Sequence, residues 1–447
     1  MPIKTQKLTH EAKAARIGQE LKSRSGSEPL SLNKGGVSHM VPNPNDPKHK
    51  DKKIFMGDLN EILDIDVHRK LCVAEPGVTF SDLVRETLKV GLMPCLVPEL
   101  KTITLGGAVS GCSVESMSYK YGGFHDSCLE YEIITAKGEI LTCSPSKNQD
   151  VFHMIHGSYG TLGILSKLKF RLIEAKPFVR MDYITFPTLV ELTQAINDHC
   201  RLKDVDFMDA IIHAPNKAVL CIGTLVDEAP SVSTYTYLEI FYKSTLKKKV
   251  DYLTTDEYLF RYDTECHWLS RTIPGMENKL FRFLFGKFLL SSTNLLTWSK
   301  RLRPLLKFDK RPDVVVDVFI PQNKILEFFD FYLEEIDYFP LWVVPYRRLQ
   351  PYPWLNDDYE KKIDDDLFFD VAIYGLKNRR KDVNYYKLLE EMVYDCHGIK
   401  TLISHNFYDK ETFWKIYNRA NWEKVKKRTD PGNKFRDLYE KFHYASK

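Results

Sequence analysis

The feature that most constrains the fold is a glycine-rich segment at residues 102–113, where glycines at 106, 107 and 111 stand among small and hydroxyl-bearing residues. Glycine has no Cβ, so backbone N–H groups there can come close to an anion or a flat ring. Two more glycine clusters, at 35–36 and 157–163, flank this segment. One such cluster alone is most often a structural turn, whereas three in this order favour a dinucleotide site.

The motifs of several other classes of protein do not occur in this sequence. The sequence has no G-x-x-x-x-G-K-[ST], no G-x-G-x-x-G and no G-x-S-x-G. This argues against a P-loop, a Rossmann dinucleotide site and an α/β-hydrolase nucleophile. The histidines form no ligand-spaced cluster with carboxylates, so we expect no metal site. The cofactor fold must therefore be of another kind.

Composition narrows the class of protein. The sequence has 447 residues, of which 43% are hydrophobic and 28% charged, as in a soluble globular protein of two or three domains. Its net charge of +4 is too small for a dedicated nucleic-acid binder. The nine cysteines form no C-x-x-C pair, which argues against a disulfide framework and indicates the reducing cytoplasm. We expect no signal peptide and no membrane-spanning helix.

Local patterns predict the elements of the first third of the sequence. In order, these are a strand at 71–74, a helix at 82–90, a hairpin of strands 131–136 and 139–143, a helix near 149–155 and a strand at 164–172. Thr79 or Ser81 is expected to cap the first of these helices. The composition changes after Pro177, where glycines become rare and aromatic residues frequent, so we expect a domain boundary near residue 178.

A later stretch, residues 279–311, is both basic and aromatic. Phenylalanines and leucines are interleaved with Lys279, Arg282 and Lys287, and further Lys and Arg residues follow. The pattern fits a helix that lies in a membrane interface. It fits almost equally a buried helix whose cationic side chains extend to solvent. We favour peripheral membrane contact through this stretch.

Taken with residues 97–100 and 136–139, the three glycine clusters resemble the FAD-binding domain of the vanillyl-alcohol oxidase (PCMH-type) flavoproteins. Within that superfamily the delta-24 sterol reductase group is the most similar. The resemblance runs in order from about residue 55 to the C-terminus. Its further similar stretches include 113–116, 258–261 with Trp268, 281–286, 340–342, Asp370 with Tyr374-Gly375, and 411–414.

The resemblance implies an α+β protein with a PCMH-type FAD-binding domain of two α/β subdomains at 1–178. An α+β substrate (cap) domain would follow at 179–400, and residues 401–447 would pack back on the FAD domain. Some members of the superfamily attach FAD covalently through a histidine in or near the loop that contains the first glycine cluster, at 35–36. Here we expect non-covalent FAD, with His39 in that loop as a hydrogen-bonding residue. The resemblance assigns the cofactor contacts to Lys34, Gly35, Gly36, Val37, Ser38, His39, Thr102, Thr104, Leu105, Gly106, Gly107, Gly111, Cys112, Ser113, Ser116, Gly122, Gly157, Gly160, Gly163 and Ile164.

The implied function is an FAD-dependent oxidoreductase that reduces a C=C bond in the side chain of a sterol or isoprenoid lipid, with NADPH as electron donor. The alternative is an FAD-dependent oxidase or dehydrogenase that acts on an alcohol group of a sugar, polyol or lipid-linked glycoside. A flavin-binding interaction protein without turnover is a third possibility, against which the intact glycine clusters count. We expect no nucleic-acid partner, and the oligomeric state stays open.

Reduction of a double bond needs a proton donor as well as a hydride. Tyr374 is a candidate acid, with a buried structural tyrosine as the alternative. His267 is a second candidate donor, or equally a satisfied interdomain histidine. Arg261 would meet flavin or substrate, unless it forms a salt bridge with Asp263 or Glu265.

Overall fold

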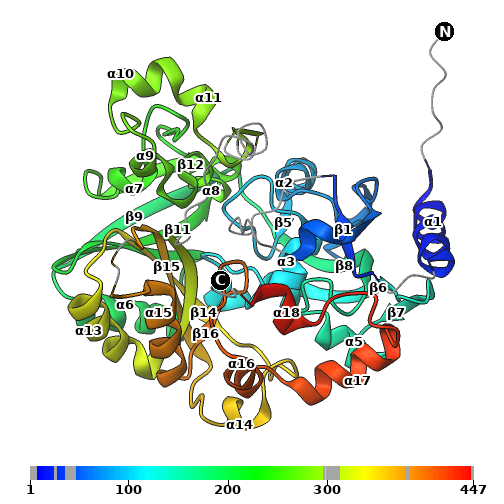
Figure 1. Cartoon of the computed structure of the whole chain (residues 1–447). Helices are drawn as coiled ribbons and strands as arrows, with labels where there is room; N and C mark the ends of the chain where they lie inside the picture. Colours follow the sequence, from blue (N-terminus) through cyan, green and yellow to red (C-terminus); the bar gives the residue numbers. More distant parts are fainter. Residues whose placement is uncertain are drawn as a thin grey trace.

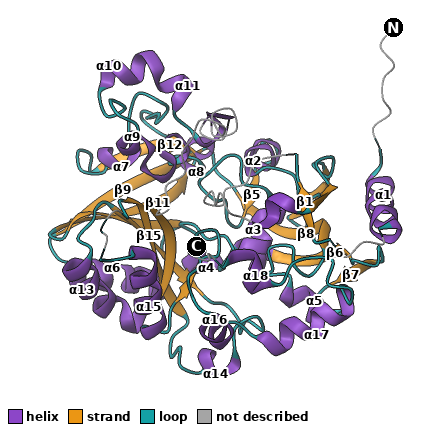
Figure 2. Cartoon of the chain, in the orientation of Figure 1, coloured by secondary structure: helices purple, strands orange, loops and turns teal. Residues whose placement is uncertain are grey.

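The computed structural model describes residues 8–24, 28–35, 47–294, 297–298, 313–378, 380 and 382–443. Two sheet-containing units lie side by side, and the C-terminal helices return to the first of them (Figure 1). Helices and strands are both abundant and are distributed over both units (Figure 2). The expected α+β class is confirmed.

The first unit is built on a six-stranded antiparallel sheet. Its strands run in the order β3-β4-β8-β6-β7, and β5 pairs with the far end of β8. A separate parallel pair joins β1 to β2. The strands are β1 (Leu30–Asn33), β2 (Lys52–Phe55), β3 (Ile62–Asp66), β4 (Leu71–Ala74), β5 (Leu92–Pro94), β6 (Cys128–Ile134), β7 (Ile140–Cys143) and β8 (Ile164–Glu174).

The helices of this unit are short apart from the first. The Thr79 side chain accepts a hydrogen bond from the backbone N–H of Asp82, which confirms it as the cap of α2. The predicted hairpin is β6 and β7, and the predicted strand at 164–172 is β8. The helices are α1 (His10–Ser23), α2 (Phe80–Leu88), α3 (Leu105–Gly111), α4 (Ser118–Tyr121) and α5 (Gln149–Met154), with short 3-10 turns η1 (Pro47–Lys50) and η2 (Phe124–Ser127).

An eight-stranded antiparallel sheet forms the second unit, in the order β12-β9-β11-β10-β14-β15-β13-β16. It begins just after β8 ends, at the start of β9. Its strands are β9 (Phe178–Phe186), β10 (Phe207–Ala214), β11 (Lys217–Val226), β12 (Val250–Thr254), β13 (Val314–Pro321), β14 (Leu341–Arg347), β15 (Leu367–Leu376) and β16 (Ile399–Lys400).

The central strands of this sheet are covered on both faces. All ten residues of β15 are buried, which explains why its sequence is apolar almost throughout. The long helices α6, α13 and α15 pack against one face, and the other face turns toward the first unit (Figure 1). The helices are α6 (Leu189–Leu202), α7 (Phe241–Ser244), α8 (Thr255–Leu259), α9 (Leu269–Thr272), α10 (Lys279–Phe281), α11 (Lys287–Leu289), α13 (Ile325–Glu335), α14 (Asp357–Glu360) and α15 (Tyr385–Asp395), with short turns η3 (Asp263–Trp268), η4 (Arg282–Gly286) and η5 (Gln322–Lys324).

Of the last three helices, α17 (Arg419–Thr429) and α18 (Leu438–Phe442) lie against the first unit, and α16 (Lys410–Ile416) packs beside α14. The backbone N–H of Ala136 donates to the carbonyl of Thr429 over 2.8 Å. The indole N–H of Trp422 donates to Thr161 Oγ1 over 3.2 Å. These contacts join the last helices to the β6–β7 hairpin and to the glycine cluster at 157–163. Across the described ranges, no helix is long and apolar enough to cross a membrane.

Candidate functional site

The central glycine segment forms a short helix, α3, rather than an open loop. Thr104 caps it, because the Thr104 hydroxyl accepts a hydrogen bond from the N–H of Gly107 over 3.3 Å. The helix ends at Cys112, whose backbone is left-handed with a φ of 54°. Both Gly111 and Cys112, at this end, line a cavity between the two units.

The cavity has a mostly apolar wall. Such a wall with few polar groups is typical of sites for small molecules and cofactors. Lys400 and Arg348 are its cationic members, and each is already ion-paired, with Glu390 and Glu360 respectively. The lining residues are Gly111, Cys112, Val114, Gly157, Tyr159, Phe319, Tyr346, Arg348, Tyr352, Trp354, Phe368, Ile399, Lys400, Thr401, Leu402 and Tyr417.

Two glycines leave bare backbone on this wall. A Cβ added at Gly157 would come no nearer than 3.8 Å to another atom, that of Trp354, and one added at Gly111 no nearer than 3.5 Å, to Tyr159. A side chain at Gly111 would therefore occupy cavity space without a clash, whereas at Gly157 the positive φ of 66° is a second reason for glycine. A flat ring system can rest against such backbone, so the residues present fit FAD.

Other glycines of the predicted site are explained by internal packing. An added Cβ would lie 2.6 Å from Pro76 at Gly106, 2.4 Å from the carboxylate of Asp126 at Gly122, and 2.9 Å from Ile133 at Gly163. These distances are too short for any side chain. Contact of these three glycines with FAD stays a prediction.

Several predicted FAD contacts are engaged by the protein itself. The hydroxyl of Ser116 accepts a hydrogen bond from Tyr258 over 3.1 Å, and the side chain is fully buried. The hydroxyl of Thr102 lies 3.2 Å from that of Ser292. The remaining described positions are the buried Leu105 and Ile164, the half-buried Gly107, Ser113 and Gly160, and the exposed Lys34 and Gly35 at the end of β1.

Part of the predicted site cannot be placed. Gly36, Val37, Ser38 and His39 lie outside the described residues. His267 belongs to the backbone of η3, but its side chain is outside the description. Their proposed roles stay predictions.

Arg261 lies in a buried ion-pair cluster and is 1% exposed. One of its guanidinium nitrogens is 2.9 Å from Glu115 Oε1 and 3.2 Å from Asp209 Oδ1. The alternative, a salt bridge to Asp263 or Glu265, is wrong, because the fold brings Glu115 and Asp209, which are far from Arg261 in sequence, onto the guanidinium instead. Arg261 therefore links the segment after α3 to β10 and is not among the residues that line the cavity.

Tyr374 also points toward the first unit, from β15. Its hydroxyl donates to Asp317 Oδ1 on β13 over 2.5 Å. Burial raises the pKa of Tyr374 well above its ordinary value, and the neighbouring carboxylates Asp317, Glu99 and Asp370 add to this. A phenol held this way is a weak acid at neutral pH, so its hydrogen bond matters more than its own proton.

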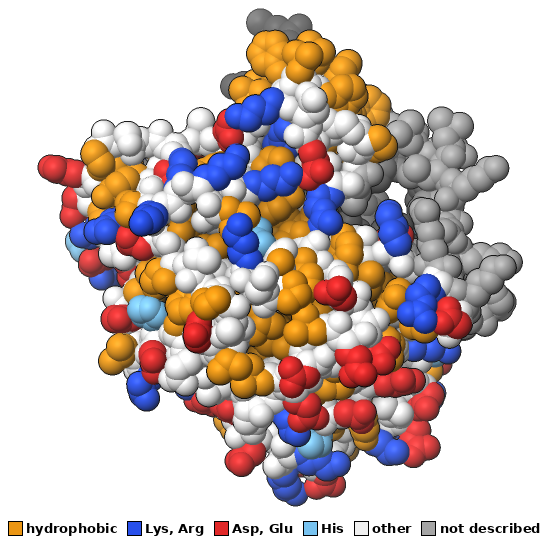
Figure 3. Space-filling model, turned by 90° about the vertical axis from the view of Figure 1, so that its left-hand side faces the viewer, with side chains coloured by type: hydrophobic (Ala, Val, Ile, Leu, Met, Phe, Trp, Pro, Cys, Tyr) orange, Lys and Arg blue, Asp and Glu red, His pale blue; other side chains and the backbone are white. Residues whose placement is uncertain are grey.

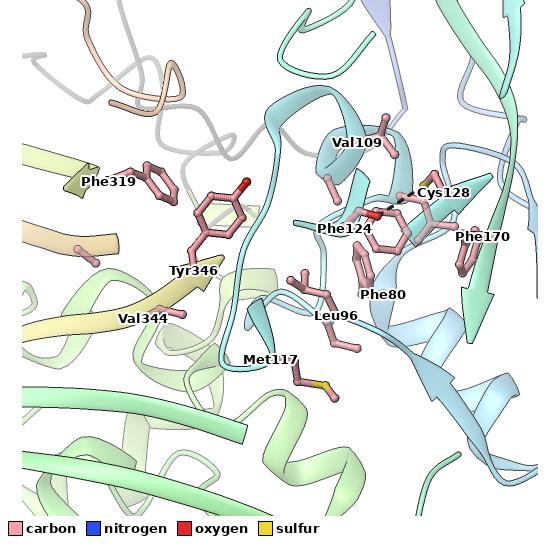
Figure 4. Packing of buried hydrophobic residues seen from close by; sticks show 14 of the residues in the cluster. Phe80, Leu96, Val109, Met117, Phe124, Cys128, Phe170, Phe319, Val344 and Tyr346 are labelled. Atoms are coloured by element: carbon pink, nitrogen blue, oxygen red, sulfur yellow. Dashed lines mark hydrogen bonds between the residues drawn. The ribbon is translucent and has the colours of Figure 1, made fainter. Parts of the chain in front are cut away.

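A second series of polar groups reaches the cavity from another side. Tyr346, on β14, shares a hydrogen bond with the hydroxyl of Tyr352, which donates to Asp126 Oδ2 over 2.7 Å. Figure 4 shows Tyr346 and Phe319 extending from their strands toward the first unit. The cavity wall thus carries tyrosine hydroxyls within a largely aromatic surface.

Sequence reasoning missed Asp317, Tyr346 and Tyr352. A signal for Asp317 was present, because one aspartate interrupts the apolar run of β13. A buried carboxylate in such a run needs a specific partner or a protonated form. The tyrosines carried no such signal, since aromatic residues are common throughout this region.

Comparisons with known proteins point to the same cofactor. Residues 34–144 match the protein-family model described as FAD binding domain. The sequence is 27% identical to "Delta(24)-sterol reductase" of Homo sapiens over 413 residues, which covers 89% of this protein and 79% of the relative. It is 25% identical to the protein of the same name from Arabidopsis thaliana, with 97% and 84% covered. A shorter match, 28% over 173 residues, is to "Cytokinin dehydrogenase 3" of Oryza sativa subsp. japonica, with 37% and 32% covered.

The fold, the cavity and the family match together define an FAD-dependent oxidoreductase with a PCMH-type FAD-binding domain. The expected resemblance to the delta-24 sterol reductases is confirmed over most of the sequence. Bound FAD would rest on Gly111 and Gly157 and would supply hydride chemistry at the cavity.

Proposed function

We propose that this oxidoreductase reduces an isolated C=C bond in the side chain of a sterol or isoprenoid lipid, with NADPH as the electron donor. The observation that carries the proposal is the cavity wall beside the bare backbone of Gly111 and Gly157. Its aromatic and aliphatic side chains suit an alkene, which offers no polar handle. The similarity to proteins named delta(24)-sterol reductase points the same way.

The protein's own residues have three tasks in this reaction. Phe319 and Phe368, on neighbouring strands, would hold the apolar side chain of the substrate. The bare backbone of α3 would fix the cofactor from the opposite side. The apolar wall would keep water away from the double bond during the reaction, so that the proton would come from a protein side chain.

The proposed activity is tested by product analysis. The protein, reconstituted with FAD, is incubated with NADPH and desmosterol, and the sterols are separated by mass spectrometry. A product heavier than desmosterol by two hydrogens supports the proposal. Absence of this product, together with oxidation of an alcohol substrate, would transfer the assignment to the alcohol oxidase or dehydrogenase alternative.

We also propose non-covalent FAD and the division into an FAD domain at 1–178, a substrate domain at 179–400 and a returning segment at 401–447. This division is supported by the sheets, because β8 is the last strand of the first sheet along the sequence and β9 is the first strand of the second. Release of the yellow colour into the supernatant on acid precipitation would support non-covalent binding. Colour that stays with the precipitate would reject it.

We further propose peripheral contact with a membrane through the projection formed by α10, η4 and α11. Large apolar side chains are exposed there, including Leu280 at 69%, Phe283 at 65% and Phe288 at 63%. Figure 3 shows hydrophobic side chains gathered at this end of the molecule. Aromatic residues beside Lys279 and Lys287 suit an anionic lipid interface. The later basic residues of the stretch, after 298, lie outside the described residues.

A further inference from the structure

Two aspartates lie close together on the buried face of the large sheet. In the β13–β15 ladder, Asp317 is opposite Ala372 and Phe319 is opposite Asp370. Because side chains alternate along a strand, both aspartates point to the same face as Phe319, which lines the cavity. Diagonal neighbours in such a ladder are about 7–8 Å apart at their Cα atoms, within reach of two carboxyl groups.

Their hydrogen bonding is unequal. Asp317 Oδ1 accepts from Tyr374 at 2.5 Å, and its backbone carbonyl accepts from the N–H of Thr401. Asp370 is 4% exposed, and its Oδ1 has no hydrogen-bond partner among the described residues. Within those residues neither carboxyl forms an ion pair with a Lys, Arg or His side chain. Asp370 is not itself among the residues that line the cavity, but its unpartnered oxygen lies on the same face of the sheet as its neighbour Phe319, which does line it.

The titratable groups around this pair are mostly acidic. Glu99, from the loop before α3, interacts electrostatically with both aspartates, and burial raises its own pKa to about 8. Arg261 is the nearby cation in the described part of the structure, and it is already shared between Glu115 and Asp209. Two carboxylates without a cation of their own in a buried site do not both ionise, so one of them keeps a proton.

We propose that Asp370 is the proton donor of the double-bond reduction, and that Asp317 and Tyr374 are positioning residues that keep its proton in place. This inference rests on the proposed function. The alkene gains a hydride at one carbon, from FAD that NADPH has reduced, and a proton at the other carbon, from the Asp370 carboxyl. The Asp370 carboxylate then regains a proton from water, so that one NADPH and one proton are consumed for each double bond.

The acidities support this assignment. Burial raises the pKa of Asp370 well above its ordinary value, and the charges of Asp317 and Glu99 raise it further. Burial also raises the pKa of Asp317, to about 6, while the hydrogen bond from Tyr374 opposes the rise. At neutral pH Asp317 is therefore the charged member and Asp370 the protonated one. A carboxylic acid protonated at neutral pH is a far better donor than a buried phenol.

The test is the variant Asp370→Asn, which keeps the shape and removes the acidic proton. The matched control is Asp251→Asn, on β12, where a second buried aspartate accepts from a tyrosine, Tyr235. We expect Asp370→Asn to bind FAD and to be bleached by NADPH as the wild type is. Reoxidation of its flavin by desmosterol should be slower by about 10²–10⁴-fold.

A second readout does not depend on turnover. The infrared difference spectrum between wild type and Asp370→Asn, at equal FAD content and neutral pH, should contain the carbonyl stretch of one protonated carboxylic acid. The difference spectrum of the Asp251→Asn control should not contain it. In Asp317→Asn the like charge is gone, so the alkaline loss of reoxidation rate should move to lower pH.

The outcomes separate this inference from the proposed function. Reoxidation in Asp370→Asn at the wild-type rate overturns the inference, even if the infrared band is lost. Absence of the infrared band overturns it as well, whatever the rates. If wild-type flavin is not reoxidised by desmosterol at all, the proposed function fails, while the infrared band still reports whether Asp370 holds a proton.

Discussion

Tyr374 and Asp317 are joined by a hydrogen bond of 2.5 Å across two neighbouring strands, on the buried face of the large sheet. The phenol donates and the carboxylate accepts, so the bond stabilises the charged form of Asp317. The hydrogen bond also holds the side chain of Asp317 in place beside Asp370. This relationship makes Tyr374 a positioning residue rather than the acid itself.

The first prediction follows from that bond. In Tyr374→Phe the pKa of Asp317 should rise, because the hydrogen bond that opposed the effect of burial is lost. A protonated Asp317 no longer holds the proton on Asp370 by its charge, so the alkaline loss of the flavin reoxidation rate should move to lower pH, with a loss of about tenfold at neutral pH. Stopped-flow absorbance across the pH range measures this. Complete loss at every pH, with Asp370→Asn unaffected, would instead identify Tyr374 as the acid.

The second prediction concerns the buried cluster around Arg261. In Arg261→Met, Glu115 and Asp209 lose their cation in a buried site, which should lower the free energy of unfolding by about 3–5 kcal/mol. Urea unfolding measures the change. The control Arg201→Met, in an exposed pair with Asp198, should change it by less than about 0.5 kcal/mol. Unchanged stability with lost flavin reduction would return Arg261 to a direct role in the chemistry.

The third prediction tests the cofactor cradle. A methyl group at Gly111 occupies cavity space without meeting the protein closer than 3.5 Å. Gly111→Ala should therefore fold normally but bind FAD about tenfold more weakly, as expected when one methyl group overfills a close-packed site. Gly432→Ala, where an added Cβ meets only Lys434 at 4.0 Å, should bind FAD as the wild type does. Equal FAD affinities by flavin fluorescence titration would place the cofactor elsewhere.

The fourth prediction is a pH dependence of stability. In α1, His10 is hydrogen-bonded to Glu132 at 2.8 Å and to Glu75 at 2.9 Å, and these bonds raise its pKa to about 9. The raised pKa means that this stabilisation is complete below about pH 6.5 and is lost as the pH rises through about 9. His10→Gln should thus lower the free energy of unfolding by about 1.5–3 kcal/mol near pH 6.

Near pH 10 the same substitution should lower the free energy of unfolding by clearly less. His199→Gln serves as the control, because its bond to Asp204 is partly exposed and joins residues only five apart. A stability loss in His10→Gln that is the same at both pH values would show that the imidazole contributes packing only, without a charged hydrogen bond.

The fifth prediction concerns the apolar projection. Replacing Phe283 and Phe288 with serine removes two exposed aromatic rings, so binding to anionic liposomes should fall by about tenfold or more. The control replaces Val190 and Leu202, two exposed apolar residues on α6, with serine. Liposome flotation measures both variants. Equal binding of both to the liposomes would remove this projection from the membrane contact.

Local structure was predictable where neighbouring residues decide it. The sequence contains the short-range patterns that predict the Thr79 cap, the β6–β7 hairpin and β8. The resemblance to FAD-binding domains likewise depended on glycines whose spacing is local. Even there the glycines are present for different reasons. At Gly106 a side chain would clash with Pro76, whereas Gly111 lines the cavity.

The acid pair was not predictable in the same way. Asp317 and Asp370 are 53 residues apart in sequence numbering, and only the β13–β15 register brings them to one face. A shift of one residue in that register would turn one of them to the opposite face. The same holds for Arg261, whose partners lie on segments far from it in sequence. No local pattern encodes long-range pairing. This is why the acid pair was missed and why the partners of Arg261 were not predicted.

The central claim, that this is an FAD-dependent reductase of a C=C bond, is tested most directly by anaerobic absorbance of the purified protein. NADPH should bleach the flavin spectrum, and desmosterol added afterwards should restore the colour. A flavin that NADPH leaves coloured, or that stays bleached after desmosterol is added, would contradict the account.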